Sequence, residues 1–169
     1  KYVFLGAIEG STVLLHRRPF KISALLDAAI TNARARAAEV GASIPISLEE
    51  DVDDFFGDRD RMHRVLDNLY LNLLKFSRAG TLIDTSIKQL DGDLVEICLT
   101  AFATKAKPSV WEEIKETVNA GLDADMQHEI SLSLALLRSV VTLHKGQLQL
   151  EGSPQTGMII RCILPRDEG

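Results

Sequence analysis

The most informative segment of this chain runs Gly57-Asp-Arg-Asp-Arg-Met-His-Arg-Val-Leu-Asp-Asn-Leu-Tyr-Leu-Asn-Leu-Leu-Lys-Phe-Ser77. Asp58 can accept hydrogen bonds from the free backbone N–H groups of a helix start, so it is a good N-cap. The apolar residues after it recur at helical spacing, which predicts a helix to about Ser77 with one buried face. That face comprises Met62, Val65, Leu66, Leu69, Leu73 and Phe76.

Beside this face stand Asn68, Asn72 and Lys75, at positions i, i+4 and i+7. They fall within roughly 60° of one another around a helix. Asn is a poor helix former, so helix propensity does not explain two of them here. Because an Asn carbonyl can ligate Mg²⁺ and a Lys can neutralise a phosphate oxygen, the pattern favours a metal-phosphate site. A solvated polar face is the alternative.

The residues before this helix predict a strand followed by another helix. The strand covers Thr12–His16 and ends at Arg17–Phe20. The helix runs from about Ala24 to Val40, with Ser23 as its N-cap and Gly41 at its end.

Strand patterns dominate the rest of the chain. Ser43–Leu48 alternates apolar and polar residues, and Pro45 favours a place at a sheet edge. Thr81–Gln89 and Leu94–Ala101 form a predicted hairpin around Asp91-Gly92, a strong turn signal. We further expect two helices and a closing hairpin, over Ser109–Ala120, Glu129–Leu143, Gln147–Glu151 and Met158–Leu164.

The resulting order, β-α-β-α-β-β-α-α-β-β, predicts an α/β (α+β) two-layer sandwich. One mixed β-sheet would be covered on one face by helices. We expect residues 11–166 to form this single domain. Residues 1–10 would be the end of a preceding segment, because the chain begins like an excised fragment.

Composition agrees with one globular domain. The chain has 169 residues, of which 46% are hydrophobic and 25% charged. No apolar run approaches the ~18 residues of a membrane-spanning helix, so we expect no direct membrane insertion of this domain.

Charge argues against a nucleic-acid partner. The chain carries 19 Lys and Arg against 24 Asp and Glu, a net charge of −5. Phosphate-binding surfaces need clustered cations, whereas the densest charge run here is acidic, at residues 49–54, and predicts a solvated loop. Cys98 and Cys162 lack CxxC spacing and are expected to be buried, reduced residues. They indicate a cytoplasmic compartment, within a parent protein that could itself be membrane-anchored.

The segment Gly57–Ser77 resembles the N-box of the histidine-kinase catalytic domain, which belongs to the GHKL ATPase superfamily and has the Bergerat fold. The pattern of that family is approximately GDxxRLxQVLxNLLxNAxKFT. The end of the chain, Leu143–Gly146, Glu151–Gly157 and Cys162–Pro165, resembles the terminal hairpin of the family. The resemblance covers roughly residues 8–165. It implies that Asn72 ligates the Mg²⁺ of Mg-ATP, and that Asn68, Lys75 and Phe76 line the nucleotide site.

Two glycine motifs of the family are altered in this chain. At the DxGxG motif, Ala101 replaces the Asp that accepts a hydrogen bond from adenine, and Ala103 replaces the first Gly. At the GxGLGL motif the chain has Ser131-Leu132-Ser133-Leu134, so the Leu spacing survives without the glycines. Losing a buried hydrogen-bond partner costs ~1–3 kcal/mol, and a Cβ restricts close backbone approach to phosphate. Leu73, where the family has Ala, adds bulk beside the Mg²⁺ position.

Two further sites bear on catalysis. Asn68 stands where ATP-hydrolysing members have a Glu, and a neutral amide cannot act as a base, so we assign no catalytic residue. His128-Glu129 resembles the dipeptide of a phosphoacceptor helix, but the second long helix of that motif is missing. We therefore assign His128 to a shortened nucleotide lid.

The resemblance leads to a main hypothesis and two alternatives. The main one is a pseudokinase-like regulatory domain of a two-component sensor, with a degenerate ATP site that binds Mg-ATP weakly or binds no cofactor. Its partners would be the dimerisation and histidine-phosphotransfer helices of the parent sensor and a response regulator. The alternatives are a divergent but active Mg-ATP-binding kinase domain, which phosphorylates a His on a partner dimerisation domain, and a stand-alone anti-sigma-type regulator.

Overall fold

A five-stranded mixed sheet forms one layer of the molecule. The computed structural model describes residues 15–48, 54–77, 80–102, 107–153 and 156–166. The strand order is β2-β4-β5-β7-β6; β2 pairs with β4 in parallel and the other neighbours are antiparallel. The strands are β2 (Ile46–Leu48), β4 (Ile83–Leu90), β5 (Leu94–Ala101), β6 (Gln147–Ser153) and β7 (Gly157–Pro165).

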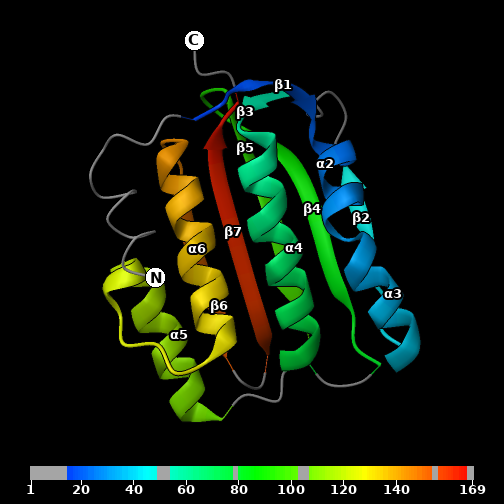
Figure 1. The fold of residues 1–169 in the computed structure, drawn as a ribbon, viewed down its shortest axis with the longest axis vertical. Helices are drawn as coiled ribbons and strands as arrows, with labels where there is room; N and C mark the ends of the chain where they lie inside the picture. Colours follow the sequence, from blue (N-terminus) through cyan, green and yellow to red (C-terminus); the bar gives the residue numbers. More distant parts are fainter. Residues whose placement is uncertain (1–14, 49–53, 78–79, 103–106, 154–155, 167–169) are drawn as a thin grey trace.

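Helices form the second layer, on one face of this sheet (Figure 1). In the described part of the chain, none is both long and apolar enough to cross a membrane. A small sheet of β1 and β3 closes one end. The remaining elements are β1 (Arg18–Lys21), α2 (Ile22–Ala29), α3 (Thr31–Val40), β3 (Asp54–Gly57), α4 (Arg59–Phe76), α5 (Pro108–Ala120), a 3₁₀ turn (Gly121–Asp123) and α6 (Glu129–Leu143). The predicted two-layer sandwich is confirmed.

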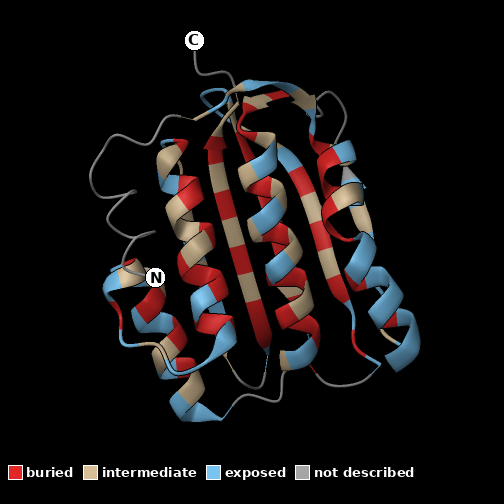
Figure 2. Ribbon diagram, in the orientation of Figure 1, coloured by how far each residue is buried: buried red, intermediate tan, exposed pale blue. Residues whose placement is uncertain are grey.

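The core lies between α4, α6 and the sheet, and Figure 2 shows the buried faces of these helices turned towards the strands. Leu66, Leu69 and Leu73 of α4 are at most 2% exposed. Burying each such side chain contributes about 1.5–3 kcal/mol, so the predicted apolar stripe is what docks this helix. Tyr70 is also fully buried, and its hydroxyl lies 2.5 Å from Thr85 Oγ1 of β4.

Local signals placed several boundaries correctly. Asp58 caps α4, because its carboxylate accepts a hydrogen bond from Arg61 N at 3.1 Å. Gly41 ends α3 in the left-handed region, with φ of 71°. The pair β4–β5 is the predicted hairpin, and α6 covers Glu129–Leu143 as expected.

The predicted helix from Ala24 to Val40 is wrong, because it is two helices. The break is Ile30, with φ −97° and ψ 4°, and this side chain is fully buried. Packing of Ile30 into the core therefore outweighs the local preference for a continuous helix. Ser23 is not the N-cap; it lies inside α2, whose N-cap is Lys21.

The first strand also differs from the prediction. Thr12 to Leu14 lie outside the described residues, and Leu15 and His16 are not in a strand. The strand is β1, over Arg18–Lys21, where the sequence predicted an exit. It pairs antiparallel with β3, at the end of the acidic run, a partner about 35 residues away that no local pattern reveals.

Candidate functional site

The two asparagines of α4 contact α6 directly. Asn72 Nδ2 donates to Ser133 Oγ at 2.5 Å and to Asn68 Oδ1 at 3.3 Å. Ser133 Oγ in turn donates to Asn68 Oδ1 at 2.5 Å. Asn72 is 6% exposed and Ser133 is 1% exposed. The expected metal ligand is thus inside a closed triangle of hydrogen bonds, rather than on an open polar stripe.

Lys75, one turn further along α4, faces an acidic partner. Its Nζ lies 3.6 Å from Glu129 Oε2 in the first turn of α6. Both side chains are mostly exposed, so this ion pair adds little stability. It does place a carboxylate beside the cation that the resemblance assigns to phosphate.

Glu113 of α5 is a site residue that sequence reasoning missed. Its Oε1 accepts from Gln127 N at 2.8 Å. Its Oε2 accepts from His128 N at 3.0 Å and from Ser131 Oγ at 2.5 Å, and His128 Nδ1 lies 3.0 Å away. Burial acts to raise the pKa of Glu113, but the hydrogen bonds from Ser131, Gln127 and His128 outweigh it and lower the pKa. These partners follow 14 to 18 residues later in a different element, so no sequence pattern signals the contact.

The remaining predicted residues lie around this contact. Ala101 ends β5 and is 1% exposed, whereas Leu132 of α6 is 39% exposed. Phe76 is half-buried and its ring centroid lies 6.4 Å from that of Trp111 on α5. Ala103 lies outside the described residues. Leu73 is fully buried in the core, so its bulk fills the space between α4 and the sheet.

Among the residues that the structure describes, two buried polar atoms near Phe76 have no hydrogen-bond partner. They are Trp111 Nε1 and Ser77 Oγ, and both residues are 2% exposed. An unsatisfied buried polar group costs about 1–3 kcal/mol, so each is a position at which a ligand could gain a hydrogen bond.

Taken together, these residues make polar contacts with one another. The amide of Asn72 already donates to Ser133 and Asn68, and Lys75 faces Glu129. Ala101 offers no side-chain acceptor to adenine.

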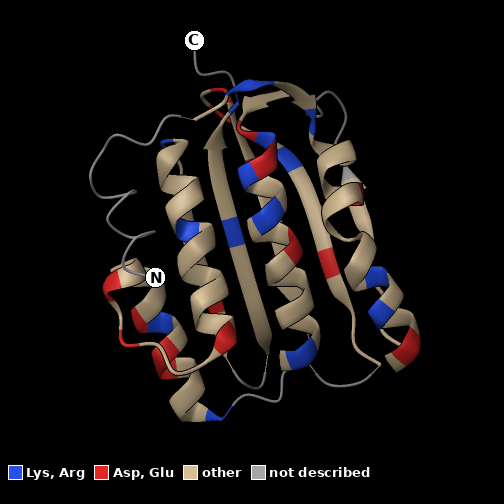
Figure 3. Ribbon diagram, in the orientation of Figure 1, with Lys and Arg blue, Asp and Glu red and all other residues tan. Residues whose placement is uncertain are grey.

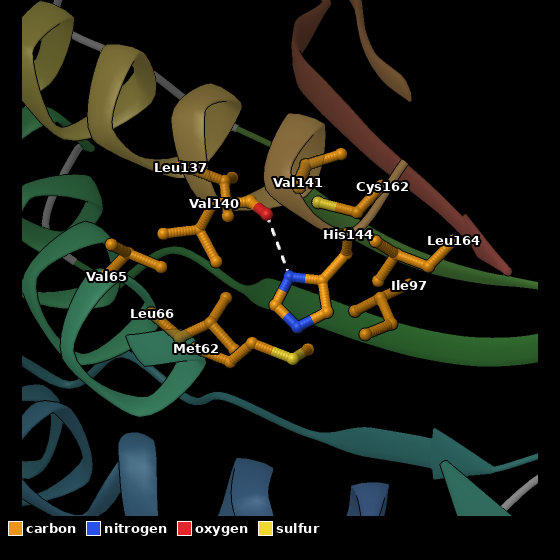
Figure 4. A pocket seen from close by; sticks show the side chains of 10 residues that line it. All are labelled: Met62, Val65, Leu66, Ile97, Leu137, Val140, Val141, His144, Cys162 and Leu164. Carbon is orange, nitrogen blue, oxygen red and sulfur yellow. Dashed lines mark hydrogen bonds between the residues drawn. The ribbon is translucent and has the colours of Figure 1, made fainter. Parts of the chain in front are cut away.

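An apolar cavity lies at the other half of the α4–α6 interface, and Figure 4 shows its lining side chains. Its volume is about 10 Å³, room for no more than one water molecule. His144 lines it; Nδ1 donates to Val140 O at 2.8 Å, and Nε2 accepts from Asp58 N at 2.9 Å. This cavity is a packing gap beside a structural histidine.

Charges on this side of the molecule are mixed. Figure 3 shows Lys and Arg interspersed with Asp and Glu along the helices. Within the described ranges, no group of three or more His, Cys, Asp or Glu side chains could hold a metal ion. Cys98 and Cys162 are both buried and unpaired, as expected from the sequence.

Sequence comparisons identify related proteins. The profile of the family described as histidine kinase-, DNA gyrase B-, and HSP90-like ATPase matches residues 57–168. The chain is 25% identical over 169 residues to the circadian input-output histidine kinase CikA of Synechococcus elongatus, covering 95% of this chain and 22% of CikA. It is 27% identical over 164 residues to the sensor protein DivL of Caulobacter vibrioides, covering 97% of this chain and 21% of DivL. The chain therefore spans about a fifth of these relatives.

Solved structures share the fold. The histidine kinase AdeS of Acinetobacter baumannii superposes with a TM-score of 0.75 at 15% identity, over 99% of this chain and 76% of that one. The catalytic domain of histidine kinase ThkA superposes with a TM-score of 0.73 at 18% identity, over 89% of this chain and 98% of that one. At these identities the likeness concerns the arrangement of helices and strands.

Proposed function

Because the chain belongs to the family of histidine kinase-, DNA gyrase B- and HSP90-like ATPases, with the fold of a sensor histidine kinase catalytic domain, we propose that it is a regulatory domain of two-component signalling with a degenerate ATP site. In this role it acts through protein interactions more than through phosphoryl transfer.

The hydrogen-bonded triangle of Asn72, Ser133 and Asn68 carries this proposal. The hydrogen bonds of Asn72 Nδ2 to Ser133 and Asn68 fix the orientation of the amide, so its carbonyl could turn towards a metal elsewhere only by breaking bonds that contribute about 0.5–1.5 kcal/mol each. A glycine at position 133 has no side chain, so it could not accept this hydrogen bond from Asn72. The serine that replaces the family glycine therefore removes backbone freedom and also engages the metal ligand.

The relatives support the proposed partners, because this chain spans only about a fifth of a histidine kinase and of a sensor protein. We propose that residues 11–166 form the domain, that residues 1–10 end a preceding segment, and that the parent supplies dimerisation and histidine-phosphotransfer helices. A response regulator would be the second partner, in the cytoplasm.

Calorimetric titration of the protein with ATP and Mg²⁺ tests the degenerate site. We expect no saturable heat up to millimolar ATP. The melting temperature should also stay unchanged, because a ligand stabilises by RT ln(1 + [L]/Kd) and a weak ligand adds almost nothing. A Mg²⁺-dependent dissociation constant in the micromolar range would overturn the proposal.

A divergent but active Mg-ATP-binding kinase domain is the second candidate. Trp111 Nε1 and Ser77 Oγ have no hydrogen-bond partner within the described ranges, and they favour this candidate, since a ligand near Phe76 could satisfy them. It predicts tight Mg-ATP binding in the same titration, and transfer of phosphate to a His of the dimerisation domain.

A further inference from the structure

The residues that lead from α5 into α6 are held by the side chain of Glu113, which belongs to α5. This single carboxylate accepts hydrogen bonds from the backbone N–H groups of Gln127 and His128 and from the Ser131 hydroxyl, and His128 Nδ1 lies within bonding distance. The Glu113 side chain is only 11% exposed. Hydrogen bonds to an ionised acceptor are shorter and stronger than those between neutral groups.

The position of this contact at the start of α6 bears on ligand binding. The first backbone N–H groups of a helix have no partner within the helix, and they favour an anion. Here the carboxylate of Glu113 accepts from the N-cap residue His128, from Gln127 just before the helix and from the hydroxyl of Ser131 in its first turn. Ser131 is fully buried. Glu129, in the same turn, adds a second negative charge and holds Lys75.

We propose that Glu113 is an internal latch: its carboxylate stands in for an anionic ligand at the start of α6, and a polyphosphate can enter only after displacing it. The inference rests on the proposed function, because it explains how the degenerate site is kept closed. It assigns an autoinhibitory role to a residue of α5 that lies outside the family's nucleotide motifs.

The chain offers a matched control on the same helix. Glu112 is the neighbouring residue and has the same charge, but its side chain is 77% exposed and lies 3.9 Å from Lys115 of its own helix. Neutralising Glu112 changes the net charge by the same amount without touching the α5–α6 connection.

The test compares Glu113→Ala, Glu113→Gln and Glu112→Gln in two measurements: amide hydrogen exchange at Gln127 and His128, and titration with inorganic triphosphate and Mg²⁺. Triphosphate is the probe because it needs no adenine contact at Ala101. In Glu113→Ala we expect the rate of hydrogen exchange at both amides to rise by about tenfold or more, as expected for losing one charge-assisted hydrogen bond. The affinity for triphosphate should rise by a similar factor. Glu112→Gln should change neither.

Circular dichroism first establishes that each variant is folded. If Glu113→Ala does not fold, the same two measurements on Glu113→Gln decide whether the latch exists. Faster exchange with unchanged triphosphate affinity would overturn the latch and leave the proposed function standing, since Glu113 would then be a structural contact alone. Tight Mg-ATP binding by the unaltered protein would overturn the proposed function and the latch together.

Discussion

At the scale of single residues, His144 links α6 to the start of α4. It is 3% exposed, accepts a hydrogen bond from Asp58 N and donates one to Val140 O. A protonated imidazole has no acceptor nitrogen, so it cannot keep the bond from Asp58 N. Burial is the main reason that the pKa of His144 lies below 6.5, although the hydrogen bond to Val140 acts to raise it.

Because the pKa of His144 is lowered in the folded chain, we expect the stability of the protein to depend on pH. The unfolded chain binds a proton near pH 6.5 and the folded chain only at lower pH, so the free energy of unfolding should rise with pH across that window and level off above it. Urea unfolding between pH 5 and 7.5 measures the slope. The slope should diminish in His144→Gln, and should persist in His16→Gln, because His16 is exposed. An unchanged slope in His144→Gln would assign it to other groups.

Asn72 gives a second prediction at this scale. Because it is buried and bonded to Ser133, we expect Asn72→Ala to lower the free energy of unfolding by about 1–3 kcal/mol. Arg64→Ala, on the same helix at an exposed position outside the triangle, is the control and should cost less. Urea unfolding of both variants measures the difference. Equal costs would argue against the buried triangle.

At the scale of elements, the carboxylate of Asp58 caps the N-terminus of α4. Asp58 accepts from Arg61 N, from Arg61 Nε at 3.2 Å and from His16 N at 3.0 Å, and it is 3% exposed. Burial acts to raise the pKa of Asp58, but these hydrogen bonds and nearby positive charge together lower it. The cap therefore joins α4 to the chain entering β1.

Removing this cap should destabilise the whole domain. We expect Asp58→Ala to lower the free energy of unfolding by about 0.5–2 kcal/mol, the range measured for N-cap replacements, and Asp58→Asn to cost less because its carbonyl still accepts. The control is Asp60→Ala, in the same helical turn with a 66% exposed side chain. Chemical denaturation compares the three. If Asp60→Ala costs as much as Asp58→Ala, general helix-dipole effects explain the result better than the cap.

At the scale of the whole molecule, the proposed nucleotide site would draw on three helices and the end of β5 at once. Ala101 ends β5, Asn72 belongs to α4, Glu113 to α5 and Ser133 to α6. A change at one of them leaves the contacts of the others in place. Restoring a ligand site therefore requires several substitutions together.

The restoration variant combines Ala101→Asp, Ala103→Gly, Ser131→Gly and Ser133→Gly. We expect it to bind Mg-ATP measurably, because the new carboxylate returns an acceptor for adenine and the glycines remove the Ser133 contact of Asn72 and the Ser131 contact of Glu113. The gain should be about 3–5 kcal/mol, or two to four decades of affinity. Calorimetry measures it, after circular dichroism has confirmed folding.

Ala101→Asp alone is the control and should gain less, since the other contacts stay. If the folded quadruple variant binds no better than the parent, the assignment of these positions to the family motifs is wrong, or Leu73 also blocks the site. Adding Leu73→Ala separates these cases. That change removes a fully buried side chain at a cost of about 2–5 kcal/mol, so its folding must be checked too.

The sequence by itself determined the elements whose signals are local. Helix α4 follows from the Asp58 cap and one apolar stripe, and the β4–β5 hairpin follows from Asp91-Gly92. The N-box resemblance then pointed to the family, because Asn68, Asn72 and Lys75 are spaced along one helix. Periodicity, caps and turn residues act over a few positions, so they can be recognised without the rest of the fold.

Only the tertiary structure decided the break at Ile30, the β1–β3 pair and the hydrogen-bond partners of Asn72 and Glu113. Ser133 lies 61 residues from Asn72 in sequence, and the partners of Glu113 lie 14 to 18 residues away, outside α5. Which polar atoms meet there depends on how α4, α5 and α6 pack against one another. A buried polar group must find a partner wherever packing places it, and no local pattern records that choice.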